Sequence, residues 1–300
     1  MRQHIKIFVS IMLAAALILC CSSCAAAPDN SGETAENTSN TTAALDLETE
    51  ESVPANAEPE TTVPSETTQE AATTPPAETN PPTPQQPPLS STLAQGPDAG
   101  QAYQDKIIFV GDSTTHHLRN REVLTGGKNT KQVWTPTSGT LTLAYVLTAK
   151  ILYPETGTEM TIMDAAGMKK PEIMVITLGM NGISFMDEAN FKTVYSELIQ
   201  KILEQSPNTK IILQSIFPRA QSGNENYASI TQDMINTGNV WVSEVAKECG
   251  VYYLDTEEIL KDENGYLRAE YSVGDGIHIS RDGYLAILEY IRTHPIPGLA

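Results

Sequence analysis

The sequence predicts a three-layer α/β/α domain with a central parallel sheet of about five strands. Beyond residue 100, short runs made almost wholly of apolar residues recur, as is typical of strands in a parallel sheet covered on both faces. Between them lie segments whose apolar residues recur at helical spacing. Strands that alternate with helices over about 200 residues indicate one such domain.

Five segments are the expected strands. Each is apolar along most of its length, and the first ends at Gly111, a residue suited to a sharp turn. They are 106–110, 131–134, 173–178, 211–216 and 251–254.

Four helices are expected between and after these strands. Apolar residues recur at helical spacing in 191–202, and Asp187 is placed to cap that helix. The same pattern in 230–245 is followed by Gly250, at a position that tolerates left-handed geometry. The other two candidates are 140–152 and 280–292.

The N-terminus (residues 1–24) is typical of a secretory signal. A short basic start precedes the apolar run 7–19, which is short for a membrane span. The stretch 19–24 resembles a bacterial lipobox, in which a cysteine after small residues is lipidated. Cys24 follows two serines and is the preferred site, with Cys21 as the alternative, although a leucine is usual three residues upstream of the lipidated cysteine. An uncleaved anchor helix is the competing interpretation.

Residues 25–100 form an expected disordered linker before a folded domain at 101–300. The linker is rich in Thr, Pro and Glu and has almost no aromatic or branched apolar residues, so it cannot bury enough surface to offset its conformational entropy. It is either a spacer that holds the domain away from a membrane or a linker with no length requirement.

Charge is divided unevenly along the chain. Fourteen acidic residues and no basic one lie between Lys6 and Lys106, so most of the net charge of −18 belongs to the linker. From Lys106 onward the net charge is −6. Binding of a nucleic-acid backbone needs clustered Lys and Arg, so nucleic acid is excluded as a partner.

Three polar turns carry the candidate chemistry. In open α/β sheets the ligand site lies at the carboxyl ends of the strands, and each turn follows an apolar strand or precedes the last helix. They are Gly111-Asp112-Ser113-Thr114, Gly179-Met180-Asn181-Gly182 and Asp275-Gly276-Ile277-His278.

Each turn has a chemical and a conformational interpretation. At a helix start, Ser113 lies beside free N–H groups that stabilise negative charge, or the turn merely caps the helix. Asn181 can offer its amide to an oxyanion, or it belongs to a common Asn-Gly turn. Asp275 can orient the ring of His278 so that the other ring nitrogen accepts a serine proton, and Ser280 in the same loop can cap the last helix.

Taken in order, these turns resemble the motifs of the SGNH/GDSL hydrolase superfamily: Gly-Asp-Ser, a glycine, Gly-x-Asn and Asp-x-x-His. The resemblance covers about residues 105–293. It implies a flavodoxin-like sheet and hydrolysis of ester bonds without a metal or cofactor. By that match Ser113 is the nucleophile, His278 the general base and Asp275 its orienting acid.

The same match implies an oxyanion hole made by the N–H groups of Ser113 and Gly139 and the side-chain amide of Asn181. The sequence departs from the family pattern at Thr114, where leucine is usual, and at Gly182, where aspartate often follows the asparagine. The second departure puts the hydrogen bonding around the site in question, but not the three catalytic groups.

Three further residues have open interpretations. His116 and His117 follow the nucleophile and either line the pocket or sit partly exposed on a helix. Cys249 is the one cysteine beyond the N-terminus and is expected to act as a small buried hydrophobe.

The expected function is a serine esterase that removes acyl groups, acetyl among them, from cell-envelope or extracellular glycans. Its expected partners are a small acyl ester or acylated glycan and, through an N-terminal lipid, the outer face of the cell membrane. Two alternatives remain: an O-acyltransferase that uses the same acyl-serine, and a catalytically silent envelope-binding module of the same fold. The sequence predicts no oligomeric state.

Overall fold

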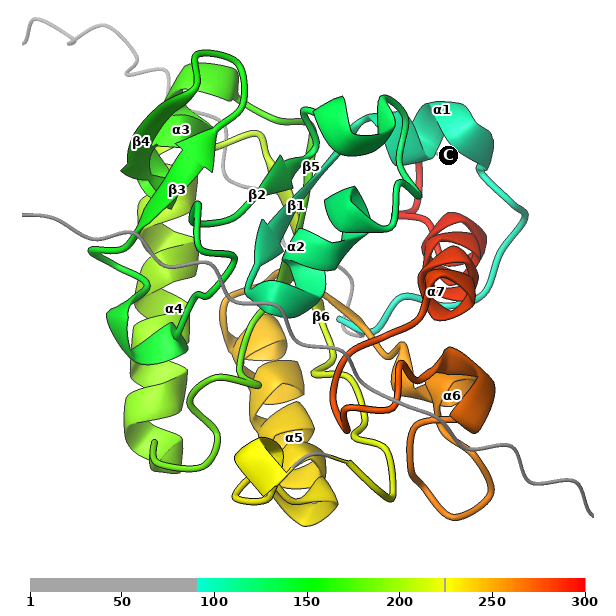
Figure 1. Ribbon diagram of the computed structural model, residues 1–300. Helices are drawn as coiled ribbons and strands as arrows, with labels where there is room; N and C mark the ends of the chain where they lie inside the picture. Colours follow the sequence, from blue (N-terminus) through cyan, green and yellow to red (C-terminus); the bar gives the residue numbers. More distant parts are fainter. Residues whose placement is uncertain (1–90, 224, 300) are drawn as a thin grey trace, which may run out of the picture. The chain divides into compact units, whose positions relative to one another are not determined.

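The computed structural model describes residues 91–223 and 225–299, and the expected signal, lipidation site and most of the linker lie outside them. Its main sheet has five parallel strands in the order β2-β1-β5-β6-β7 (Figure 1), which confirms the predicted fold class. Counted along the chain, the strand order is 2-1-3-4-5, the flavodoxin-like arrangement. The strands are β1 Ile107–Gly111, β2 Val133–Trp134, β5 Ile173–Thr177, β6 Lys210–Gln214 and β7 Tyr252–Leu254.

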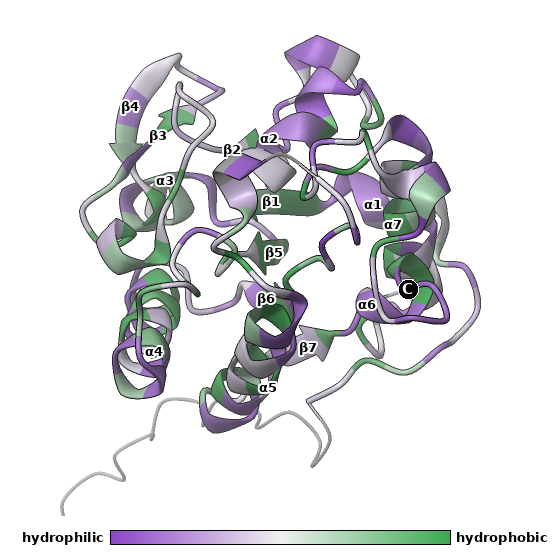
Figure 2. Cartoon of the chain, turned by 60° about the horizontal axis from the view of Figure 1, so that its bottom comes forward, coloured by the Kyte–Doolittle hydropathy of each residue, from purple (hydrophilic) through white to green (hydrophobic). Residues whose placement is uncertain are grey.

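Alternating side chains on each strand supply two separate cores. In β1, Ile108 and Val110 belong to one buried cluster, whereas Ile107 and Phe109 belong to the other. Both faces of the sheet are therefore apolar, which explains the unbroken hydrophobic runs in the sequence. Figure 2 shows these hydrophobic strands at the centre of the layers.

Helices cover both faces of the sheet. The first core is covered by α3 Ile162–Lys169, α4 Glu188–Gln205 and α5 Gln232–Glu248. The second is covered by α1 Gly100–Asp105, α2 Ser113–Asn120, α6 Glu257–Leu260 and α7 Arg281–Thr293. Short 3₁₀ turns occupy η1 Gly127–Asn129, η2 Leu143–Tyr145, η3 Glu225–Tyr227 and η4 Ala269–Tyr271.

Three of the expected helices are confirmed, and their ends are where the sequence predicts them. The Asp187 carboxylate accepts a hydrogen bond from the Asn190 N–H at 2.8 Å at the start of α4. The Ser280 hydroxyl caps α7 through the N–H of Gly283. Helix α5 ends just before Gly250, whose φ is +66°.

The expected helix at 140–152 is wrong. That segment contains only the η2 turn and then the strand β3 Lys150–Tyr153, which pairs antiparallel with β4 Thr158–Thr161. Its threonines and branched residues have low helix propensity. The turn that follows closes a hairpin, with the Gly157 N–H donating to the Tyr153 carbonyl and a φ of +72° at Gly157.

The packed domain begins about ten residues before the expected start at 101. The Tyr253 N–H donates to the Ser91 carbonyl at 2.7 Å, and the Leu93 N–H donates to the Tyr253 carbonyl at 2.8 Å, so residues 91–93 extend the sheet beside β7. Leu93 is buried in the second core. Within residues 91–223 and 225–299, no helix has both the length and the apolarity that a membrane span requires.

Candidate active site

The turn after β1 places Ser113 at the first position of α2. A Cβ at Gly111 would lie 2.4 Å from the Thr177 carbonyl oxygen of β5, so only glycine fits where the two strands end side by side. The Asp112 side chain then caps α2 by accepting hydrogen bonds from the Thr114 N–H at 2.9 Å and its hydroxyl at 2.8 Å. Helix α2 therefore starts at Ser113, at the point where the strand order of the sheet reverses.

Ser113, His278 and Asp275 contact one another in the predicted order. The Ser113 hydroxyl lies 2.9 Å from His278 Nε2, although the two residues are 165 positions apart in the chain. His278 Nδ1 lies 2.6 Å from an oxygen of the Asp275 carboxylate. An alcohol, an imidazole and a carboxylate in this arrangement can activate the alcohol as a nucleophile.

Local hydrogen bonds hold the Asp275 carboxylate in place. Its second oxygen accepts from the N–H groups of Ile277 at 3.1 Å and His278 at 2.9 Å. Burial alone raises the pKa of Asp275, but the hydrogen bonds from the His278 backbone, the His278 ring and the Ile277 N–H outweigh it and leave that pKa below its ordinary value. The carboxylate is therefore ionised at neutral pH and holds an N–H of the His278 ring.

A separate contact joins the two segments that carry these groups. The buried hydroxyl of Tyr284 in α7 donates to the Thr114 carbonyl in α2 at 2.6 Å. Because α7 begins directly after the loop that contains His278, this bond fixes the loop relative to the helix of Ser113.

Two aromatic rings flank His278. The His117 ring lies 4.7 Å from it and the Tyr227 ring 5.9 Å, both measured between ring centroids and both in edge-to-face geometry. Burial, followed by the charges of His278 and Arg121, lowers the pKa of His117 to about 4. His117 is therefore a neutral neighbour of the triad. It is also half-buried on α2, so whether it lines a substrate pocket stays a prediction.

His116 has a different position. Its Nδ1 lies 3.0 Å from the Thr135 hydroxyl, and a Cβ at Gly139 would meet its ring at 3.0 Å. His116 thus lies on α2 and packs its ring against the loop after β2.

The three expected oxyanion donors differ in their availability. Ser113 opens α2, so its N–H has no acceptor within the helix. One N–H of the Asn181 amide donates to the Leu141 carbonyl at 3.2 Å, which leaves the other for a ligand. The Gly139 N–H donates to the Pro136 carbonyl at 2.8 Å and closes a tight turn. An oxyanion would have to displace that bond, so the role of Gly139 stays a prediction.

A protein-family model matches most of this domain and shows to which family the chain belongs. The model of the GDSL-like lipase/acylhydrolase family matches residues 109–286, which is more than half of the chain. The chain belongs to this family. The matched part of this GDSL-family chain runs from β1 into α7 and includes Ser113, Asn181, Asp275 and His278.

Solved structures of other proteins are similar to this GDSL-family chain at low identity. A GDSL-like lipase from Bacteroides thetaiotaomicron is 17% identical over 67% of this chain and 90% of its own, with a TM-score of 0.43. A DUF4886 family protein from Bacteroides uniformis is 16% identical over 64% and 83%, with a TM-score of 0.43. A family two carbohydrate esterase from Clostridium thermocellum is 16% identical over 62% and 62%, with a TM-score of 0.41. No curated protein matches the chain.

The GDSL-family domain places one residue beside the site that the sequence did not single out. Tyr227 lies in the long loop after β6, which carries no motif, and this loop contacts the His278 loop where the Ala220 N–H donates to the Gly276 carbonyl at 2.8 Å. Only the tertiary contact identifies Tyr227, because its neighbours in sequence have no recognisable pattern.

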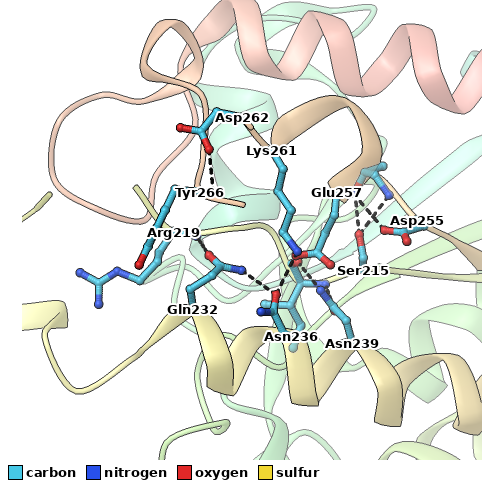
Figure 3. A network of polar contacts seen from close by, with 12 residues as sticks. Ser215, Arg219, Gln232, Asn236, Asn239, Asp255, Glu257, Lys261, Asp262 and Tyr266 are labelled. Carbon is cyan, nitrogen blue, oxygen red and sulfur yellow. Dashed lines mark hydrogen bonds and ion pairs between the residues drawn. The ribbon is translucent and has the colours of Figure 1, made fainter. Parts of the chain in front are cut away.

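A polar network anchors that loop (Figure 3). The Gln232 side chain accepts from the Arg219 N–H at 2.9 Å and donates to Asn236 at 3.0 Å, and Lys261 donates to the same Asn236 oxygen at 2.9 Å. The Asn239 amide binds both the N–H and the carbonyl of Ile216. The beginning of the loop is therefore fixed to α5, which is bound in turn by Lys261, the residue after α6.

Metal-binding side chains and cysteines complete the description of the candidate site residues. Within the part of the GDSL-family chain that the structure describes, no three His, Cys, Asp or Glu side chains converge as a metal site would require. Cys249 is a partly buried free thiol that packs against the first core. The lipidation candidates Cys24 and Cys21 lie outside the described residues.

Proposed function

We propose that this chain is a serine esterase in which Ser113 is the nucleophile, His278 the general base and Asp275 the residue that orients it. The observation that carries the proposal is the pair of contacts at His278: 2.9 Å from Nε2 to the Ser113 hydroxyl and 2.6 Å from Nδ1 to Asp275. Membership of a lipase/acylhydrolase family supports the same chemistry.

The proposed reaction has two steps. Ser113 Oγ attacks the ester carbonyl while His278 Nε2 takes its proton, and Asp275 stabilises the imidazolium that forms. The tetrahedral intermediate collapses, the ester C–O bond breaks, and the imidazolium protonates the departing alcohol. Water then attacks the acyl-serine with the same base, and the acid and free Ser113 are released.

The negative charge of each intermediate needs donors beside Ser113. The Ser113 N–H at the start of α2 and the free N–H of the Asn181 amide are the proposed donors. Ser113 follows β1 and Asn181 follows β5. These two strands are neighbours in the sheet, since Gly111 at the end of β1 pairs with Thr177 at the end of β5. Loss of one such donor lowers turnover on the order of 10²–10³-fold in serine hydrolases.

We propose further that the substrate is an acyl ester, acetyl among them, of a cell-envelope or extracellular glycan. The support is the signal-like start of the sequence, with Cys24 or Cys21 as its lipidation site, and the Thr-, Pro- and Glu-rich stretch that follows. Release of acetate from O-acetylated wall polymers tests this substrate class. Inactivity on them, alongside good activity on aryl esters, contradicts it.

Active-site labelling tests the catalytic proposal. The full chain is treated with a fluorophosphonate, and we expect one adduct that maps to Ser113 by peptide mass spectrometry. The Ser113→Ala variant should take up no label. A folded chain that is labelled elsewhere, or not at all, contradicts the proposal.

A kinetic comparison tests the orienting role of Asp275. The Asp275→Asn variant keeps the shape of the side chain but favours the wrong tautomer of His278, so kcat on 4-nitrophenyl acetate should fall by roughly 10³–10⁴-fold. KM should change little. An Asp275→Asn variant with nearly wild-type kcat shows that the carboxylate has no role in the reaction.

A further inference from the structure

One side of α2 carries two residues that contact the His278 ring, Ser113 and His117. Ser113, His117 and Arg121 follow one another at intervals of four residues, and residues four apart lie on the same side of a helix. The middle residue fixes which side this is, because the His117 ring packs 4.7 Å from the ring of His278. Arg121 lies one turn further on, about 12 Å along the axis from Ser113.

The end of α2 holds Arg121 in a defined position. The Glu122 N–H donates to the Arg119 carbonyl at 3.1 Å and the Val123 N–H to the Leu118 carbonyl at 3.3 Å, which together form a Schellman motif. Glu122 has a φ of +56°, a left-handed conformation that is unfavourable for a non-glycine residue. The helix therefore stops directly after Arg121, at a residue that is not the usual glycine.

The guanidinium of Arg121 has no partner within residues 91–223 and 225–299. Its Nε is buried and donates to no acceptor there. The other partly buried arginines of this part all donate hydrogen bonds: Arg119 to Val133, Arg219 to Ala220 and Ile230, and Arg292 to Asp98 and Gln104. Neighbouring atoms close off the Nε, so an acceptor from outside the chain would bind the two terminal nitrogens of the guanidinium, which have no partner among these residues either.

The charge of Arg121 affects the pKa values of two residues near the site, His117 and Tyr284. It is among the charges that lower the pKa of His117, after burial and His278. It also opposes the rise that burial imposes on the pKa of Tyr284, the residue that joins α7 to α2. The Asp275 carboxylate, the acidic group of the triad, is already bound to His278.

We propose that Arg121 binds an anionic group of the substrate, and that the ester cleaved at Ser113 carries a carboxylate or phosphate within about 12 Å of its acyl group. A guanidinium binds either oxyanion through two parallel hydrogen bonds, a geometry that lysine does not reproduce. The inference rests on the proposed esterase function and names the substrate class more closely: an acyl ester of an acidic sugar.

Matched esters test the inference with the full chain. The substrates are an O-acetylated methyl glucuronoside, O-acetylated glucose 6-phosphate and a neutral O-acetylated methyl glucoside. We expect Arg121→Gln to lower kcat/KM for a charged ester on the order of 10–100-fold more than for the neutral ester, which is the contribution of a hydrogen bond to a charged group. The loss on 4-nitrophenyl acetate should match the loss on the neutral ester. Whichever charged ester responds identifies the anion.

Two further variants serve as controls. Arg121→Lys keeps the charge but loses the planar fork, so its loss should be intermediate. Lys128→Gln removes an exposed cation from the same loop region and should leave all four substrates unaffected. Equal losses on charged and neutral esters, or no loss on either charged ester, overturn the inference.

A binding measurement separates this inference from the esterase proposal. Methyl glucuronoside and glucose 6-phosphate, which contain no acyl group, are titrated into the wild type and Arg121→Gln by calorimetry. Weaker binding of one of them to the variant supports the inference even where no ester is cleaved. No binding to the wild type, or equal binding to both, overturns it, whereas the esterase proposal is decided by labelling at Ser113 alone.

Discussion

His117, which lies beside the triad, makes the stability of the domain depend on pH in mild acid. Its pKa is lowered to about 4 in the folded chain, from 6.5 for a free side chain. The unfolded chain therefore binds a proton more readily, so the stabilisation is complete above about pH 6.5 and is lost as the pH falls from there through 4. Asp275, whose pKa is also lowered, loses its contribution only below its ordinary value of 3.8.

We expect His117→Phe, which cannot be protonated, to lose less stability in mild acid than the wild type. Urea denaturation at pH 7 and pH 4.5 gives the free energy of unfolding of both proteins. The wild type should show the larger drop between the two pH values. Equal drops mean that His117 is not the group that takes up the proton.

At the scale of single residues, the sequence predicts the positions of residues in motifs and not those set by tertiary packing alone. Ser113, Asp275 and His278 meet as predicted because each belongs to a short motif at the end of a strand or beside a helix. Arg121 and Tyr227 belong to no motif, and their positions depend on how α2 and the loop after β6 pack. The binding role of Arg121 stays a proposal.

At Gly111, where β1 ends, neighbouring atoms lie too close to leave room for a side chain. A Cβ there would lie 2.2 Å from the Thr115 hydroxyl and 2.4 Å from the Thr177 carbonyl oxygen, and that oxygen belongs to the backbone of β5. Gly111→Ala should therefore lower the free energy of unfolding by about 1–3 kcal/mol, the usual cost of overpacking. Chemical denaturation of the variant and the wild type measures the difference.

Gly96→Ala is the matched control for this change. A Cβ at Gly96 meets nothing closer than Pro295, at 3.8 Å, so the variant should stay within about 0.5 kcal/mol of the wild type. If both variants lose the same amount, the contact with Thr177 is not the cause.

Strands and helices were predicted best where their pattern was long or uniform. All five parallel strands were found, since each is buried on both faces and reads as an apolar run. The β3–β4 hairpin was missed because β4 is partly exposed, and because the apolar residues of 140–152 permit a helix as well as a strand. In the structure β3 is positioned by the Leu152 N–H, which donates to the Thr135 carbonyl at 2.9 Å.

At the scale of the whole molecule, the stretch before α1 completes the sheet. Residues 91–93 hydrogen-bond to Tyr253, and Leu93 is only 6% exposed. A chain that starts at residue 101 should therefore be less stable than one that starts at residue 91 by about 2–5 kcal/mol, the range for removing a buried leucine. Thermal and urea denaturation of the two chains measure this loss.

Leu93→Ala in the longer chain separates the contribution of the side chain from that of the backbone pairing. The stability of this variant should fall between those of the two chains, because the hydrogen bonds to Tyr253 remain. Indistinguishable stabilities of all three proteins would show that residues 91–100 lie on the domain without supporting it.

The two halves of the triad come from opposite ends of the folded chain, 165 residues apart, and are joined by Tyr284 near its C-terminus. During synthesis, the proposed nucleophile emerges long before the proposed base. A nascent polypeptide is therefore without a complete triad, however well its early strands have formed. The proposed ester cleavage should then begin only when the last helix has docked, so the appearance of activity would report the completion of folding.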